Sequence, residues 1–385
     1  MTPATLGTGV ALGRREMATA SRPIRSLTIT QFESPAETGL VTVVIPTYNR
    51  SAIVRRAIES ALKQTYRNLE CVVVDDGSSD DTRAVIQSYG SRIRYIYQEN
   101  AGVTAARNVA IRHARGEFLA FLDSDDLWKP WRIESQVAAL RRHPEAGLAW
   151  TDMTAVERSG TEICERYLRT MYAAHSRVSV EREMRQVDTL GALCAKPPVE
   201  YSSAPVRCGD LFSEILLGNL LHTSTVLVRR EWVERVGGFD PTFVRAGEDY
   251  EFYVRLCSLG PVIFIDAPST LYCVGAPDQL TRPSMLLEIA RNNLRTIKKW
   301  VPHAGSHLTL PRRALQTRFA DSYGWLGEAE LDAGNRLAAA RVLVRSLAHR
   351  PRVDRCGLLL AISMLPNVLL TRLRTLRSKL RARAH

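Results

Sequence analysis

The chain has 385 residues, a formal net charge of +12 and a hydrophobic content of 45%. This length accommodates one large α/β domain with a smaller appendage, and the apolar content suffices for a packed core. A high positive charge is typical of proteins that bind nucleic acids. However, the sequence has no zinc-finger spacing, helix-turn-helix signal or RNA-recognition signature, which argues against nucleic-acid binding. Much of the excess lies in a C-terminal tail with no acid after Asp354: Arg372, Arg374, Arg377, Lys379, Arg381 and Arg383.

The cysteines and the N-terminal segment indicate a compartment. Seven cysteines are scattered without a Cys-x-x-Cys pair, which favours reduced thiols in the cytoplasm over a disulfide framework. No apolar run reaches the roughly 18 residues of a membrane span. Residues 1–39 lack the apolar core of a secretory signal, so we expect a flexible leader there without an assigned role.

From residue 40 onward, short apolar strands alternate with helices. We expect strands at Val41–Ile45, Cys71–Val74, Arg94–Tyr97, Phe118–Leu122 and Leu148–Thr151, and helices at Ser51–Gln64, at Ala101–Ala114 and after Pro130. This alternation predicts an α/β fold with a doubly wound, mostly parallel sheet, whose ligands bind at the carboxyl ends of the strands.

Three of these strands end in polar residues that would gather at one edge of the sheet. The first is followed by Pro46, Thr47, Tyr48 and Asn49, the second by Asp75 and Asp76, and the strand at 118–122 by Asp123, Ser124, Asp125 and Asp126. Asp123 and Asp125 lie two apart and could converge on one Mg²⁺ or Mn²⁺, while Asp126 would point elsewhere. The alternative is an acidic turn that caps the next helix. No glycine-rich dinucleotide motif or Walker lysine loop follows the first strand.

The second half of the chain gives fewer signals. Residues 152–207 show no clear period, and we expect a helix at Cys208–Leu217 and strands at Thr223–Val228 and Val262–Ile265. His222 either binds an acceptor or is an ordinary buried or surface histidine, which is the favoured reading. Glu248 and Asp249 begin a helix, where carboxylates complement the helix dipole whatever else they do.

The C-terminal region is expected to be helical. Helix periodicity covers Ser284–Trp300, Arg312–Asp332 and Asn335–Ala348, and the last two resemble one paired-helix repeat. Leu358–Leu370 and the arginines after it form a basic amphipathic segment. Such a segment either lies on an anionic membrane surface or is a solvated helix end.

Several of these segments together resemble the family 2 glycosyltransferases of GT-A fold. They are Val44–Arg50, Val73–Ser78, Asn100–Asn108, Gly116–Phe118 and Phe121–Asp126. The resemblance runs from about Val41 to Leu280 and implies an inverting transferase that uses a nucleotide-activated sugar. It implies a donor site at Pro46, Thr47, Tyr48, Asn49, Asp75, Asp76, Arg107, Asp123 and Ser124, and a metal at Asp123 and Asp125. The catalytic base would be Asp249, with Glu248 as the fallback or orienting partner, because an acceptor hydroxyl must lose a proton as it attacks.

One departure from the family pattern concerns the leaving-group side of the site. The family often carries Tyr-Arg-x-His after the strand expected at 262–265, whereas this chain has Tyr272-Cys-Val-Gly275. Neither basic residue is present, so any contact they make with the leaving group is absent here or comes from elsewhere, with Arg282 as a candidate.

The resemblance organises the chain into a leader at 1–39, a GT-A domain at 40–282 and a helical region at 283–385. Within the domain, 40–151 would bind the nucleotide sugar and 152–282 the acceptor. We expect a cytoplasmic enzyme on the inner face of the membrane, acting on a glycan or lipid-linked acceptor in polysaccharide or glycolipid synthesis. The alternatives are a sugar-nucleotide nucleotidyltransferase, or a non-catalytic nucleotide-binding scaffold.

Overall fold

The computed structural model describes residues 31–243, 245–275, 282–351 and 355–364. Its strands are β1 Glu37–Thr47, β2 Leu69–Asp76, β3 Arg94–Gln98, β4 Gly116–Phe121, β5 Leu127–Trp128, β6 Leu148–Val156, β7 Glu162–Cys164, β8 Arg185–Thr189, β9 Pro205–Gly209, β10 Val226–Arg229 and β11 Val262–Cys273. Its α-helices are α1 Val54–Leu62, α2 Thr82–Gln87, α3 Val103–His113, α4 Arg132–Arg142, α5 Leu168–Met171, α6 Val180–Glu183, α7 Leu190–Leu193, α8 Phe212–Ile215, α9 Arg230–Val236, α10 Glu248–Cys257, α11 Leu286–His303, α12 Arg312–Asp332, α13 Arg336–His349 and α14 Arg355–Met364.

One sheet organises residues 37–273. Its order is β3-β2-β1-β4-β10-β6-β11-β9-β8, with β5 paired to β11 and β7 paired to β6 off this path. β1 pairs in parallel with β2 and β4, β2 with β3, and β6 with β11. β10 runs antiparallel between β4 and β6, so β4 and β6 point the same way. The predicted mostly parallel sheet is confirmed, with β10 as an antiparallel insertion.

Both faces of the sheet are buried, which explains the continuous apolar runs in its strands. Successive residues of β1 alternate between two cores: Val43 and Ile45 pack with α1 and α4, while Val44 packs on the face covered by α3 and α10. The helix after the first strand, α1, and the helix after the third strand, α3, therefore lie on opposite faces of the sheet. The sheet is doubly wound, as the sequence predicted.

Two sequence predictions about boundaries are wrong. β1 begins at Glu37, and Gly39 N donates to Oε2 of Glu117 at 2.7 Å, so the expected leader extends too far into the ordered domain. The expected helix from residue 208 to 217 is also wrong, because Cys208 lies in β9 and pairs with Ile263 of β11. Pairing with the long central strand overrides the local helical pattern there, and α8 keeps only residues 212–215.

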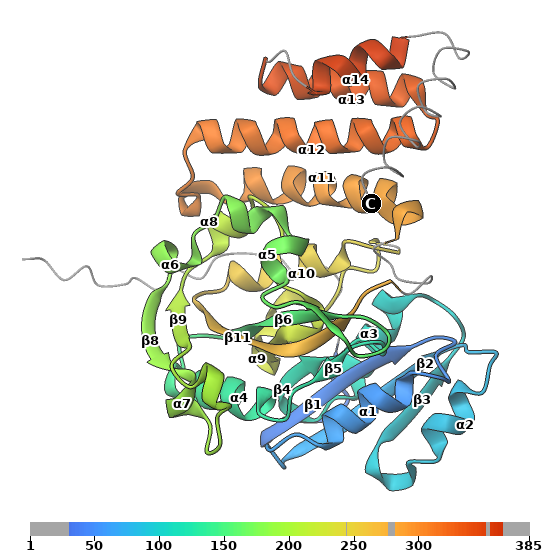
Figure 1. The fold of residues 1–385 in the computed structure, drawn as a ribbon, viewed down its shortest axis with the longest axis vertical. Helices are drawn as coiled ribbons and strands as arrows, with labels where there is room; N and C mark the ends of the chain where they lie inside the picture. The colour runs from blue at the N-terminus through green and yellow to red at the C-terminus, as the bar shows by residue number, and fades with distance from the viewer. Residues whose placement is uncertain (1–30, 244, 276–281, 352–354, 365–385) are drawn as a thin grey trace, which may run out of the picture.

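The C-terminal helices stack on the sheet domain, with α11 nearest to it and α12, α13 and α14 following outward (Figure 1). α12 has the predicted bounds, and α11 and α13 lie within about one turn of theirs. Gly327 of α12 permits a close approach to α13, because a Cβ atom there would lie 2.5 Å from Cγ of Leu343. Residues 1–30 and 365–385, which hold the leader and the basic tail, lie outside the described residues.

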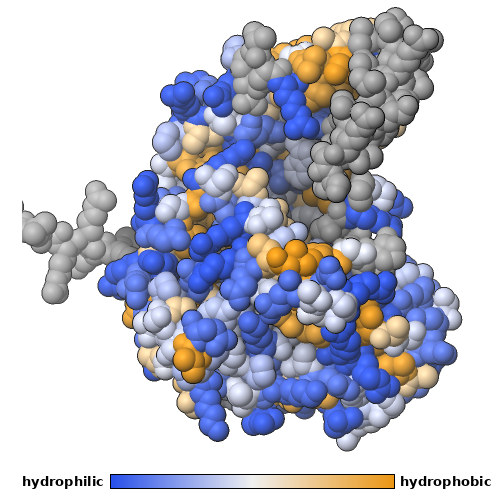
Figure 2. All heavy atoms as spheres, in the orientation of Figure 1, coloured by the Kyte–Doolittle hydropathy of each residue, from blue (hydrophilic) through white to orange (hydrophobic). Residues whose placement is uncertain are grey.

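The described surface facing the viewer is mainly hydrophilic, with small apolar groups between polar side chains (Figure 2). Within the described ranges, no helix combines the length and the hydropathy required to cross a bilayer.

Candidate active site

A cavity of about 1350 Å³ opens where β1, β2 and β4 end and where α3 and α10 begin. Most of the predicted site residues line it: Pro46, Thr47, Tyr48, Asp76, Arg107, Asp123, Ser124, Asp125, Glu248 and Asp249. The structure therefore gathers side chains that lie up to about two hundred residues apart in the chain. Such a position, at the carboxyl edge of a parallel sheet, is where open α/β folds bind ligands.

Asn49 and Asp75 are not among the lining residues, and their printed contacts shape the loops beside the cavity. Oδ1 of Asn49 accepts from the backbone N of Ser79 at 2.8 Å, in a backbone conformation with φ of 51°. Asp75 accepts from the backbone N of Ser78 at 2.9 Å and from the Tyr95 hydroxyl at 3.0 Å. These contacts hold the ends of β1 and β2 in place, and the direct donor-binding roles of both residues stay predictions.

Asp76 fixes the loop that leads into α3. Its Oδ1 accepts from the backbone N of Ala101 at 2.9 Å and from Nε2 of Gln98 at 2.6 Å, and its Oδ2 accepts from the backbone N of Gly102 at 2.8 Å. These three hydrogen bonds hold the carboxylate in one orientation at the start of α3. It presents a fixed hydrogen-bond acceptor at the cavity wall.

Arg107 of α3 is the central cation of the site. Its side chain is only 3% exposed, and it bonds Oδ1 of Asp123 at 2.7 Å and Oε1 of Glu248 at 2.6 Å. Burial acts to raise the pKa of Asp123, but the Arg107 guanidinium, helped by His222, outweighs it and lowers that pKa. One buried guanidinium thus ties the acidic end of β4 to the first residue of α10.

The acidic loop after β4 is arranged differently from the sequence prediction. Oδ2 of Asp125 pairs with Arg50 at 3.1 Å. Asp126 was expected to point away from Asp123, whereas its buried carboxylate lies beside Asp123 and accepts from Oγ of Ser224 at 2.6 Å. Ligand-type atoms of Asp123, Asp126 and His222 all lie within 4.8 Å of one another.

This donor set suits a divalent cation. Carboxylate oxygens are the ligands that Mg²⁺ and Mn²⁺ prefer. The His222 ring is buried, and burial lowers its pKa to about 4, so the neutral imidazole retains a lone pair. His222 is buried and also lines the cavity, so the choice between an ordinary buried histidine and a functional one stays a prediction. Its place beside Asp126 was missed, because nothing in the local sequence links residue 222 to residue 126.

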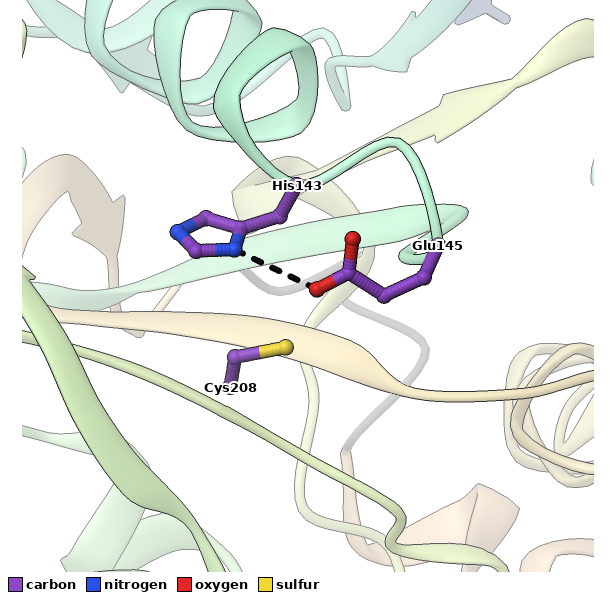
Figure 3. Close-up of side chains that lie close together, drawn as sticks. All are labelled: His143, Glu145 and Cys208. Atoms are coloured by element: carbon purple, nitrogen blue, oxygen red, sulfur yellow. Dashed lines mark hydrogen bonds and ion pairs between the residues drawn. The ribbon is translucent and has the colours of Figure 1, made fainter. Parts of the chain in front are cut away.

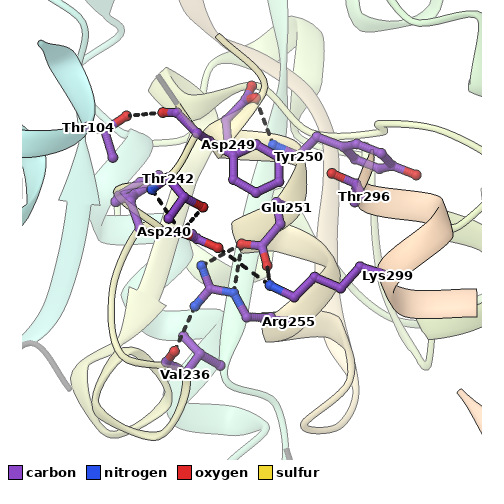
Figure 4. Close-up of polar contacts among 12 residues, drawn as sticks. Thr104, Val236, Asp240, Thr242, Asp249, Tyr250, Glu251, Arg255, Thr296 and Lys299 are labelled. Carbon is purple, nitrogen blue, oxygen red and sulfur yellow. Dashed lines mark hydrogen bonds and ion pairs between the residues drawn. The ribbon is translucent and has the colours of Figure 1, made fainter. Parts of the chain in front are cut away.

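Asp249 stands at the start of α10, where its Oδ1 accepts from the backbone N of Tyr250 at 2.7 Å (Figure 4). Burial, and then the neighbouring Glu248 carboxylate, raise the pKa of Asp249 to about 7. Oε2 of Glu248 is buried and has no hydrogen-bond partner among the described residues. A carboxyl group with a pKa near neutrality can accept a proton from a bound hydroxyl at physiological pH.

A second group of metal-binding residue types lies away from this cavity, where α4 ends beside β9. It consists of His143, Glu145 and Cys208, with Nδ1 of His143 and Oε1 of Glu145 3.3 Å apart (Figure 3). The Glu145 side chain is 54% exposed, as in an ordinary solvated surface pair.

Comparison with known proteins bears on this site. Residues 42–170 match the model of a family described as Glycosyl transferase family 2. These residues belong to that family. The family 2 segment supplies most of β1, all of β2 to β7 and the cavity residues that follow β1, β2 and β4, whereas Glu248, Asp249 and Tyr272 lie beyond it.

Two relatives are also similar to part of this chain. An uncharacterized glycosyltransferase of Rickettsia prowazekii is 29% identical over 225 residues, which cover 58% of this chain and 61% of the relative. The Escherichia coli UDP-Glc:alpha-D-GlcNAc-diphosphoundecaprenol beta-1,3-glucosyltransferase WfgD is 43% identical over 106 residues, 27% of this chain and 42% of the relative. The chain thus spans less than two thirds of these relatives' lengths.

Among solved structures, the fold is similar to S. aureus TarS 1–349 in complex with UDP-GlcNAc. The TM-score is 0.49 and the sequence identity 17%, over 80% of this chain and 88% of that chain.

Proposed function

We propose that this chain is an inverting, metal-dependent glycosyltransferase that moves a sugar from a nucleotide diphosphate donor to an acceptor hydroxyl. The observation that carries the proposal is the bridge from Arg107 to Asp123 and Glu248. It joins the family 2 segment to the residue beside Asp249, so that a donor-binding edge and a candidate base share one cavity.

The donor half follows from the side chains at the strand ends. Thr47, Tyr48 and Asp76 would flank and bond the nucleobase, and Asp123 with Ser124 would contact the ribose. Tyr48 is 46% exposed, so its ring is accessible for stacking against a base. WfgD, by its printed name, uses UDP-Glc as donor, and a nucleoside diphosphate sugar is the corresponding ligand class here.

Mn²⁺ or Mg²⁺ would be held by Asp123 and Asp125, with Asp126 and His222 within reach of the same position. When bound, such an ion neutralises charge that develops on the departing diphosphate. Arg107 adds a fixed positive charge that needs no reorganisation, because two carboxylates already orient it.

On the acceptor side, Asp249 would take the proton of the attacking hydroxyl. Glu248 keeps its hydrogen bond to Arg107 and raises the proton affinity of Asp249 through its charge. Attack from the side opposite the leaving group inverts the anomeric centre, and a single carboxylate base then suffices.

The proposed setting is the synthesis of a cell-surface polysaccharide or glycolipid, on a glycan or lipid-linked acceptor. A cytoplasmic location at an anionic membrane surface, reached through the basic tail after residue 364, is part of this proposal. The nucleotidyltransferase alternative is less favoured, because residues 46–50 contain no glycine- and lysine-rich phosphate loop.

The test is calorimetric titration of a panel of nucleotide sugars and nucleoside diphosphates with Mn²⁺. Wild-type protein should bind one of them, and Asp125→Ala should lose the Mn²⁺-dependent part of that affinity. Glu162→Ala, which changes an exposed carboxylate of β7 outside the cavity, is the matched control. Unchanged affinity in Asp125→Ala would remove the metal assignment, and failure of every nucleotide to bind would remove the proposed function.

A further inference from the structure

The cavity extends well past the residues proposed for the donor. Its volume of about 1350 Å³ exceeds the roughly 300–1,000 Å³ of ordinary small-molecule sites. The additional wall comes from Met285 and two helices of the C-terminal region, α11 with Ile289 and Asn293, and α12 with Arg318, Asp321 and Trp325. The region after residue 283 is thus part of the site and not only an appendage.

The α12 wall is held at a fixed distance from the candidate base. Arg318 is 6% exposed, and its Nε donates to the carbonyl of Leu216 at 3.0 Å. Its Nη2 donates to Oδ1 of Asn293 at 2.8 Å and lies 3.5 Å from the hydroxyl of Tyr250. Because Tyr250 directly follows Asp249, this buried arginine connects α11, α12 and the start of α10.

Asp321 and Trp325 stand on the same face of α12 as Arg318, at the three- and four-residue spacing that aligns side chains along a helix. Asp321 pairs with Arg177, another residue of the cavity lining, at 2.8 Å. Trp325 lies one turn further on and is partly exposed. The wall therefore places the Trp325 indole near the Asp321–Arg177 ion pair. The Asn293 amide belongs to the same wall.

This combination fits an uncharged ring that is apolar on one side and bears hydroxyls at its edge. The carbon-bound hydrogens of a pyranose can pack on an aromatic face, while its hydroxyls bond carboxylate and amide groups. Arg177 and Asp321 compensate each other's charge. Arg318 remains charged, but it is 6% exposed and its donors already bond Leu216 and Asn293, so an uncharged ligand fits the accessible part of this wall.

We propose that the α12 face formed by Arg318, Asp321 and Trp325 is the subsite for the acceptor's sugar ring. The proposal rests on the proposed function, and it deepens it by assigning the acceptor's sugar ring to residues of α12, outside the family 2 segment. Trp325 supplies the packing surface, Asp321 a hydroxyl acceptor, and Arg318 positions both relative to Asp249.

Saturation-transfer NMR on the full chain can test this without a known acceptor. The probes are a panel of methyl hexopyranosides, recorded with UDP or GDP and Mn²⁺ in the same sample. Wild-type protein should transfer saturation to at least one glycoside, and Trp325→Ala should weaken its affinity by about tenfold, the size expected for a lost aromatic contact. Trp325→Phe should restore part of it.

Leu337→Ala is the matched control, because this α13 side chain is 78% exposed and lies outside the cavity. Glycoside affinity equal to wild type in Trp325→Ala, or no glycoside signal from wild type, would overturn the inference. Loss of the nucleotide signals from wild type would count instead against the proposed function. If Trp325→Ala does not fold, Asp321→Asn is the second variant, and it should also weaken the affinity for the glycoside.

Discussion

Replacing Glu251 of α10 by glutamine should destabilise the protein strongly, although the residue is not in the cavity. The Glu251 side chain is fully buried. Its Oε2 accepts from Nε of Arg255 at 2.8 Å, and its Oε1 accepts from Nζ of Lys299 at 2.9 Å and from Nε1 of Trp300 at 3.2 Å (Figure 4). This carboxylate joins the helix that carries the candidate base to α11.

The magnitude follows from what the substitution leaves behind. Glutamine has one acceptor oxygen, so its amide group must face either Arg255 or Lys299. The charge of Glu251 is lost to both cations, and Lys299 alone keeps a second carboxylate, Asp240 at 3.5 Å. Removing one partner of a buried ion pair costs about 3–5 kcal/mol. Because native proteins are stable by only about 5–15 kcal/mol, the loss is a large part of the total.

Lys299→Met is the informative comparison, because the Lys299 side chain is 29% exposed and water can replace part of its role. It should cost about 1 kcal/mol, and the double variant should cost less than the sum of the single changes. Urea denaturation followed by tryptophan fluorescence gives all three values. A loss below about 1 kcal/mol for Glu251→Gln would refute the reasoning.

Three further outcomes can be checked. The pKa of Asp249 is raised to about 7, and a base must be deprotonated to act, so turnover should fall as the pH drops through 7. Asp249→Asn should retain donor binding but lose most turnover, and the turnover that remains should no longer depend on pH in this range. Gly147→Ala should destabilise the fold by about 1–3 kcal/mol in thermal or urea unfolding, since its Cβ would lie 1.8 Å from the Trp232 ring, and adding Trp232→Phe should recover part of that loss. Truncation after Arg355 should abolish flotation with anionic vesicles. Continued flotation would indicate that the tail is a solvated helix end that does not bind the membrane.

The parts of the fold that the sequence predicted are those with strong local signals. Val41–Ile45 is a run rich in β-branched residues and Phe118–Leu122 an uninterrupted apolar run, and each is buried on both faces of the sheet. α12 was predicted with the bounds that the structure gives it. The Gly-Glu-Asp sequence at residues 247–249 placed the start of α10 correctly.

The parts that were missed depend on partners distant in the chain. Nothing near Cys208 shows that β9 will pair with β11, and nothing near Asp126 shows that Ser224 will hold its carboxylate. The wall supplied by α12 was likewise invisible, because Arg318 and Trp325 read as ordinary members of an amphipathic helix. Function-bearing contacts of this kind arise from tertiary packing, not from a local pattern.

The position of β10 has a consequence for how the chain is made. A ribosome that has released residues up to 170 has delivered β4 and β6 but not the strand between them, which arrives at Val226–Arg229. Until then both strands present open edges, the situation that invites aggregation. The family 2 segment expressed alone would keep those edges, so we expect soluble material only from fragments that continue through β11.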